Sequence, residues 1–377
     1  MPRRGVGDAG SRPPRVGFTS IVGTLSDLSA VIDGWDRATA LFGGLPPPRV
    51  LPHPGETGRP LGEPTDLRVA VVEHPAGISG ALARTLRTYV ARIATSRVDV
   101  DPGYWLEPAA RVARSAVNPP VPKWTTLWNE ERQAVVRGFP RPRLPVSVAG
   151  AHGAESLKQP TRVLLLDTGD LRAVRQEIFL LGQSDRPDDP PPDWHGHGTS
   201  LGDVIRLRAP KAIVTALRIY EPEARYCASA TLLAALTWAL HHFAGADVVC
   251  VAQRAVITEP HASHVEVLER ILGHAVAHKL TAPIVVCAAG NSPGGRELMA
   301  LPAIMPGVVT ARAIGWSGNV LPYNCRLPRD QRVDIVDAYG GEESDPIGVT
   351  ADPGHGAVRM VGSSYAAALV TGALAAG

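Results

Sequence analysis

The sequence predicts an α/β protein with a mainly parallel β-sheet flanked by helices, preceded by a proline-rich N-terminal extension. From residue 161 onward, short apolar runs alternate with longer segments of helical apolar spacing, as in βαβ units. Several of these runs are apolar at every position, which is typical of strands buried on both faces. Before residue 161, prolines interrupt the pattern repeatedly. We therefore divide the chain into 1–160, an extension or small α/β regulatory region of unknown role, and 161–377, one α/β domain.

The elements of the second region follow in the order expected of right-handed crossovers. Strand-like runs are TRVLLLDTGD (161–170), KAIVTALRIY (211–220), ADVVCVAQ (246–253) and APIVVCAAGN (282–291), and helical segments are 228–243, 264–280 and the small-residue segment that ends the chain. In such sheets, functional sites form at the carboxyl ends of the strands. Asp167 and Asn291 both lie at such an end, so we expect a site there.

In the first region, the apolar spacing predicts a helix over 24–42, a strand over 67–74 and a helix over 79–94. The proline-rich stretch 44–66 predicts a surface linker, because proline blocks regular elements. Nothing in these residues indicates what the region does.

Composition excludes several classes of protein. With 45% hydrophobic and 20% charged residues the chain is expected to fold, and its net charge of +2 indicates neither a nucleic-acid partner nor a membrane surface. No apolar run reaches the roughly 18–20 residues of a membrane helix. The N-terminus lacks a signal-peptide core, so we expect a cytoplasmic protein. Cys250 and Cys287 fall in strand-like runs, which favours buried thiols over disulfides.

Four places carry the groups that nucleophilic acyl transfer requires: a hydroxyl, an imidazole base, a carboxylate that orients it and donors for the oxyanion. They are Asp167 in LLLDTGD, His197 in HGHGTS, Asn291 in CAAGNS and Ser364 in GSSYAAALVTG. Taken singly, each has an ordinary interpretation: a turn former, a packed histidine, a turn asparagine and a helix N-cap. Their joint presence, in this order and with these neighbours, is hard to explain by accident.

With these motifs, residues 161–377 resemble the subtilisin-like serine proteases, or subtilases. Asp-Thr-Gly at 167–169 is similar to the family's Asp-(Ser/Thr)-Gly, and Gly-His-Gly-Thr at 196–199 to its histidine motif. Gly-Ser-Ser-Tyr-Ala-Ala at 362–367 is similar to its Gly-Thr-Ser-x-Ala-Ala. The resemblance implies a three-layer α/β/α fold, a triad of Asp167, His197 and Ser364, and Asn291 in the oxyanion hole. Ser363 then stands where the family usually has threonine.

The expected position of Ser364 agrees with this chemistry. Ser364 would open a helix, so its hydroxyl and backbone N–H would lie at the positive end of the helix dipole. Small residues after it would allow that helix to pass through the centre of the domain. By the same resemblance, Ala252, Gln253, Arg254, Ala289 and Gly290 would bind substrate.

The sequence departs from the family in several places. Many members have Ser-Leu-Gly where this chain has 252–254, and Arg254 on the wall of the first specificity pocket would either favour acidic side chains, weakly, or block the pocket. The proline that usually follows the Ala-Ala after the nucleophile is missing. The chain stops at Gly377, where members usually continue. No propeptide is recognisable, although 67–100 has a β-α pattern that a folding-chaperone segment shares.

Metal sites have weaker support. His195 and His197 in HGH lack the further ligands of a metallohydrolase. His274 and His278 have the spacing of a zinc pair but lack the glutamate of H-E-x-x-H. The acidic run 185–193 would attract calcium, but a solvated loop is the default. We expect no metal and no cofactor.

Two functions remain open. The first is a serine endopeptidase that acts on protein or peptide substrates, with residues 1–160 as a regulatory, targeting or inhibitory extension that would act within the same molecule. The second is a catalytically inactive subtilisin-like scaffold that binds proteins, for which the altered 252–254 segment would be the sign. Retention of all four chemical groups favours the first. A serine esterase of another fold is a distant third, since no G-x-S-x-G elbow has the right context.

Overall fold

The computed structural model describes most of the 377 residues. The described ranges are 15–53, 63, 66–74, 79–109, 111–117, 160–179, 193, 195–221, 224, 226–242, 245–257, 262–278, 283–328, 333–342, 347–352 and 356–376. For 79, 111–117, 242, 274–278, 293, 348–352 and 356–359 it describes the backbone alone.

A parallel sheet of seven strands forms the centre of the molecule, in the order β15-β14-β13-β11-β7-β9-β8. Several of its inner strands are continuous apolar runs of the sequence, which bury side chains on both faces. The strands are β7 (Arg162–Asp167), β8 (Arg175–Ile178), β9 (Ile213–Arg218), β11 (Val248–Val251), β13 (Ile284–Ala288), β14 (Val308–Ile314) and β15 (Asp334–Tyr339). The predicted parallel α/β architecture is confirmed.

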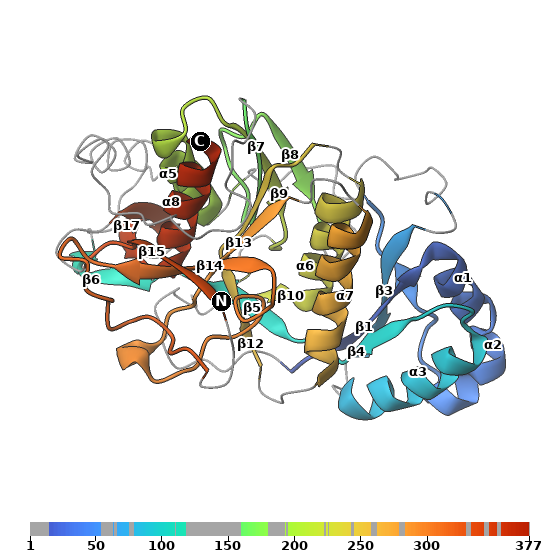
Figure 1. Cartoon of the computed structure of the whole chain (residues 1–377). Coiled ribbons are helices and arrows are strands. Elements are labelled where there is room, and N and C mark those ends of the chain that lie inside the picture. Colours follow the sequence, from blue (N-terminus) through green and yellow to red (C-terminus); the bar gives the residue numbers. More distant parts are fainter. Residues whose placement is uncertain are drawn as a thin grey trace.

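Helices cover both faces of this sheet (Figure 1). On one face lie α5 (His197–Arg208) and α8 (Ser363–Ala376), which share an apolar cluster with Val163 and Leu165 of β7. On the other lie α6 (Ser229–Thr237), extended by a π-helical turn (Trp238–His242), and α7 (Ala262–His278), which pack with Leu164 and Leu166. Alternate residues of one strand therefore serve the two helical layers.

The small residues of α8 have a packing reason. A Cβ atom added to Gly372 would lie 2.7 Å from the Cβ of Arg208 on α5, closer than real side chains approach. From Ser363 to Ala375, every residue of α8 is buried. The helix thus runs through the interior against α5, as its composition predicted.

The N-terminal residues form a second sheet beyond α6 and α7, at the right of Figure 1. Its antiparallel strands lie in the order β2-β3-β1-β4. In chain order the unit is β1 (Phe18–Thr24), α1 (Leu25–Asp33), α2 (Trp35–Ala38), a 3₁₀ turn (Thr39–Phe42), β2 (Arg49–Val50), β3 (Leu67–Glu73), α3 (Ser79–Ile93) and β4 (Asp99–Asp101). This is the β-α-β-β-α-β arrangement of ferredoxin-like units.

Each face of this second sheet has its own partner. Ile21 and Val72 pack under α1 and α3, whereas Val22 and Val69 join the cluster that contains α6. The predicted strand 67–74 and helix 79–94 are confirmed within a residue. The predicted helix 24–42 is interrupted at Gly34, which caps α1, and the preceding strand β1 was not expected.

After β4 the chain crosses to the carboxyl ends of the central sheet. There β5 (Trp105–Pro108) lies between β10 (Cys227–Ala228) and β12 (Gln253–Val256), antiparallel to both. Further on, β6 (Arg111–Val117) pairs with β17 (Gly356–Val361), which also pairs with β16 (Gly348–Asp352). Strands of the predicted extension are therefore built into sheets of the second region.

All four cysteines are free and buried, as the sequence predicted. Within the described ranges, none of the helices is both long and apolar enough to cross a membrane.

Candidate functional site

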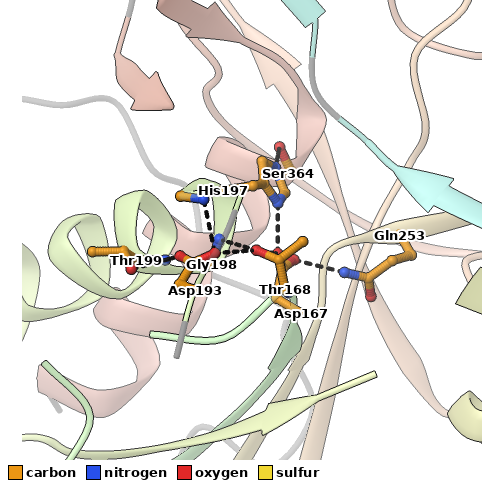
Figure 2. Close-up of polar contacts among 9 residues, drawn as sticks. Asp167, Thr168, Asp193, His197, Gly198, Thr199, Gln253 and Ser364 are labelled. Carbon is orange, nitrogen blue, oxygen red and sulfur yellow. Dashed lines mark hydrogen bonds and ion pairs between the residues drawn. The ribbon is translucent and has the colours of Figure 1, made fainter. Parts of the chain in front are cut away.

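The structure brings three of the predicted residues together at the carboxyl end of β7 (Figure 2). Asp167 ends β7, His197 begins α5, and Ser364 lies in the first turn of α8. The Nδ1 atom of His197 is 2.7 Å from Asp167 Oδ1, and its Nε2 atom is 3.2 Å from the Ser364 hydroxyl. All three side chains are fully buried. This geometry allows a proton to pass from the hydroxyl to the imidazole, with the carboxylate orienting the ring.

Hydrogen-bond donors surround the carboxylate of Asp167. The backbone N–H of Thr168 donates to Oδ1 at 2.7 Å, and the side-chain amide of Gln253 donates to Oδ2 at 2.6 Å. Both oxygens of this buried carboxylate therefore have a hydrogen-bond donor. The buried side chain of Gln253, a predicted substrate-binding residue, reaches this carboxylate, as Figure 2 shows, while its backbone in β12 pairs with β5.

A second buried carboxylate, that of Asp193, holds the histidine segment. It accepts hydrogen bonds from the backbone N–H groups of Gly196 (2.7 Å) and Thr199 (2.8 Å) and from the hydroxyls of Thr168 and Thr199. Burial raises the pKa of Asp193 to about 6, although these hydrogen bonds oppose the shift. The sequence interpretation missed this role, because Asp193 ends an acidic run that reads as a solvated loop.

Close packing sets where His197 lies. A Cβ atom added to Gly198 would be 1.9 Å from the carbonyl oxygen of Gly169, so only glycine allows α5 to approach the loop after β7. The N–H of Gly198 donates to the Thr168 hydroxyl at 3.0 Å. The glycine directly after His197 therefore has a steric purpose.

Asn291 and Ser363 connect the end of β13 to the start of α8. Ser363 N–H donates to Asn291 Oδ1 at 2.9 Å, and the Ser363 hydroxyl accepts from Gly290 N–H at 3.0 Å. The Nδ2 atom of Asn291 is buried and has no hydrogen-bond partner among the described residues. Next to Ser364, this asparagine retains an unused donor.

The chain itself occupies the space beside Ser364. The backbone N–H of Ser364 donates to the carbonyl oxygen of Ala109 at 2.9 Å, and Ala109 N–H donates to the carbonyl of Ala252 at 2.9 Å. Ala109 directly follows β5, whose Pro108 and Glu107 face residues of β12. A peptide in extended conformation is thus aligned along the site, with one carbonyl bound at the N-terminus of α8.

The residues before Ala109 make side-chain contacts of two kinds. Leu106 is fully buried in an apolar cluster with Cys227, Ala228 and Ala255 of the flanking strands. Glu107 instead forms an ion pair with Arg254. Neighbouring residues of this segment therefore meet an apolar cluster and a charged side chain.

Other predicted residues have less direct positions. Ala289 donates to the Ala311 carbonyl at 2.9 Å, and Gly290 adopts a positive φ of 89° beside Cys325. The His195 and His197 rings are 6.1 Å apart. The side chains of His274 and His278, and residues 185–192, lie outside the part that the structure describes. In the described part, no three His, Cys, Asp or Glu residues gather as metal ligands.

Comparisons with known proteins agree with this fold. The subtilase family model matches residues 181–376. The chain is similar in structure to the epidermin leader peptide processing serine protease EpiP from Staphylococcus aureus, with 14% identity, a TM-score of 0.51 and coverage of 95% of this chain and 87% of that chain. The prenylagaramide maturation protease PagA matches at 19% identity and a TM-score of 0.41, covering 67% of this chain and 78% of that one. No curated protein matches the chain.

Proposed function

The chain belongs to the subtilase family, and on this basis we propose that it is a serine endopeptidase whose N-terminal region inhibits it. The family membership supports a serine peptidase that acts on peptides or proteins. The residues that perform the reaction, the mechanism and the inhibition are our proposal, and they rest on the geometry of the site.

Ser364 is the proposed nucleophile. Its Oγ attacks the carbonyl carbon of the scissile peptide bond while His197 Nε2 takes the hydroxyl proton, and Asp167 stabilises the imidazolium that forms. The same imidazolium then protonates the leaving amine, which gives an acyl-enzyme. Water, activated by His197, hydrolyses this ester and restores Ser364.

The oxyanion of the tetrahedral intermediate needs donors that are already in place. The Ser364 N–H is one, and it already binds a carbonyl oxygen at 2.9 Å. The proposed second donor is Asn291 Nδ2, which is buried without another partner among the described residues. The backbone N–H of Ser363 donates to Oδ1 of Asn291, so the side-chain amide is held in place before the reaction begins.

One observation carries the proposal: Ala109 is bound at the start of α8 as we expect of the residue whose carbonyl carbon is attacked. Its carbonyl oxygen accepts from Ser364 N–H, and its own N–H donates to the Ala252 carbonyl. The preceding residues extend β12 by antiparallel pairing, the mode in which extended peptides bind a sheet edge. The peptide bond after Ala109, which joins it to Ala110, is then the bond that Ser364 cleaves in its own chain.

The same contacts make the N-terminal region an inhibitor. Residues 105–109 fill the site, and the ferredoxin-like unit that precedes them packs on α6 and α7, which holds the segment at high effective concentration. Cleavage after Ala109 removes the covalent link but leaves these contacts, so we expect the severed region to inhibit until it dissociates or is degraded.

The alternative function is that of an inactive scaffold that binds proteins without cleaving them. A scaffold has no need for a histidine between a carboxylate and a hydroxyl, nor for an unused amide beside the hydroxyl. The assembled geometry therefore supports the peptidase.

Labelling with a fluorophosphonate tests the nucleophile directly. Once the full chain has cleaved itself and the severed N-terminal region has been lost, it should become labelled. Ser364→Ala should not be labelled, and Ser317→Ala, which changes an exposed serine, should be labelled at the rate of the unaltered chain. Labelling that persists in Ser364→Ala, or never occurs in the unaltered chain, contradicts the proposal.

A further inference from the structure

We propose that Arg254 selects substrates with an acidic side chain at the position of Glu107, two residues before the residue whose carbonyl carbon is attacked. The inference rests on the proposed function, because it takes residues 105–109 as bound like a substrate. It names a specificity determinant that the peptidase reaction itself does not require.

Backbone register places the two side chains together. In the antiparallel pair of β5 and β12, Arg254 and Glu107 are direct Cα partners. Consider any extended peptide that pairs with β12 in this register and has one carbonyl bound to Ser364 N–H. The residue two positions before that carbonyl then lies opposite Arg254. The pairing is thus a property of the binding site and not of this segment alone.

The contact is close and largely sheltered from water. Arg254 Nε donates to Glu107 Oε1 at 2.8 Å, and Nη2 lies 2.6 Å from the same oxygen. The exposed fractions of the two side chains are 16% and 18%. Shelter from solvent reduces screening, so the ion pair discriminates more strongly than a surface pair.

The rest of the protein holds the guanidinium in place before a peptide binds. Arg254 Nη1 forms an ion pair with Glu297 and lies 3.8 Å from the sulfur of Cys325. The side-chain stem runs past Gly290, where an added Cβ would be 3.2 Å from Arg254 Cδ. With Nη1 engaged, the Nε–Nη2 edge of this planar group remains for the peptide.

The chemistry of that edge predicts the order of preference. An acidic side chain supplies both charge and acceptor. Glutamine supplies an acceptor alone, and lysine places a second cation against the first. We had predicted Arg254 on the wall of the first pocket. Its guanidinium instead contacts Glu107, two residues before Ala109. One substrate can therefore have a small residue at the Ala109 position and an acidic residue at the Glu107 position.

A charge swap in the full chain tests the contact without relying on activity. In a Ser364→Ala background, hydrogen–deuterium exchange of residues 105–109 is measured for the parent, Arg254→Glu, Glu107→Arg and the double variant. We expect each single change to speed exchange by about tenfold, and the double variant to return to within about threefold of the parent. Single variants that exchange like the parent, or a double variant as fast as the singles, overturn the inference.

A matched control is Arg312→Glu. Arg312 forms an ion pair with Asp337 across neighbouring strands through two hydrogen bonds of 2.7 and 2.9 Å, far along the chain from β5 and β12. Exchange of 105–109 should not change in this variant. If it speeds exchange as much as Arg254→Glu does, the effect is a general loss of stability and the inference fails.

Peptide cleavage tests the consequence for substrates. Because we expect the N-terminal region to inhibit the enzyme, the full chain is first incubated until it has cleaved itself and the severed region has been degraded. It is then given acetyl-Trp-Leu-X-Pro-Ala-Ala-Arg peptides with glutamate, glutamine or lysine at X, and kcat/KM is measured. We expect glutamate to exceed glutamine by about fivefold and lysine by about twentyfold, with Arg254→Glu reversing the order of glutamate and lysine. Equal cleavage of all three overturns the inference and leaves the proposed function standing. Cleavage of none of the peptides overturns the proposed function. The hydrogen-exchange experiment then still tests whether Arg254 holds the residue at the Glu107 position.

Discussion

The amide nitrogen of Ser364 lies 2.9 Å from the carbonyl oxygen of Ala109, although most of the chain separates the two residues. This hydrogen bond joins the start of α8 to the end of β5, and so joins the two regions of the molecule at the site. In the same structure, Asp167, His197 and Ser364 have no exposure to solvent. The proposed enzyme is therefore closed in the state that the structure describes.

Removing the amide of Asn291 should slow self-cleavage more than it weakens binding. If its Nδ2 atom stabilises the oxyanion, Asn291→Ala lowers the rate by about 10² to 10³, because the donor acts chiefly in the transition state. The rate is measured from the disappearance of the full-length chain, and kcat and KM from peptide cleavage. Asn319→Ala, at an exposed position, is the control. A loss expressed in KM alone would contradict the assigned role.

Gln253 should act through Asp167. In Gln253→Leu, Oδ2 of the buried carboxylate loses its 2.6 Å donor, and an unsatisfied buried acceptor of this kind costs about 1–3 kcal/mol. We expect kcat to fall by about 10- to 100-fold and its pH profile to shift, since the carboxylate that faces His197 has changed. Circular dichroism should show the native fold. An unchanged kcat and pH profile would leave Gln253 as a packing residue only.

Gly198 and Gly273 form a matched pair of helical glycines with opposite expectations. Gly198→Ala places a methyl group 1.9 Å from the Gly169 carbonyl oxygen and should displace His197 or prevent folding. Gly273→Ala, on α7, meets nothing within 4 Å and should stabilise the chain by about 0.5–1 kcal/mol through helix propensity. Chemical denaturation measures both. A Gly198→Ala variant that is as stable and active as the unaltered chain would contradict the packing described above.

The N-terminal unit should depend on pH through Asp27. Burial by itself would raise the pKa of this carboxyl group, but hydrogen bonds from Ser96, Thr24 and Thr95 lower it from 3.8 to about 2. The ionised group therefore stabilises the folded chain above about pH 4, and this contribution is lost as the pH falls through 2.

Asp27→Asn should thus cost about 2 kcal/mol at pH 7 and about half as much at pH 3. Urea unfolding of the variant and the unaltered chain at both pH values gives the difference. A destabilisation that is the same at the two pH values would show that the hydrogen bonds, and not the charge, carry the effect.

Much of the central fold follows from local pattern. Apolar or mostly apolar runs predicted β7, β9, β11 and β13, because strands buried on both faces have few polar residues. Asp167, His197 and Ser364 could be predicted because packing also restricts the residues next to them, which gives recognisable motifs. The carbonyl oxygen of Gly169 leaves no room for a side chain at Gly198, and α5 leaves room only for small residues along α8.

The path of the N-terminal region could not be predicted in this way. Trp-Leu-Glu-Pro is short, contains a proline and has no alternating pattern, and its pairing depends on backbone hydrogen bonds to β10 and β12 far along the chain. Asp193 was overlooked for a related reason. Its hydrogen-bond donors lie outside the acidic run, in Gly196 and Thr199 just after it and in Thr168 after β7, so the run itself gives no sign of them.

The central claim is that residues 105–109 lie in the site of an active peptidase as its first substrate. Intact-mass analysis with N-terminal sequencing of the incubated full chain tests it most directly. The account predicts a new amino terminus at Ala110 in the unaltered chain and none in Ser364→Ala. A chain that stays intact, a first cut at another bond, or the same cut in Ser364→Ala would contradict it.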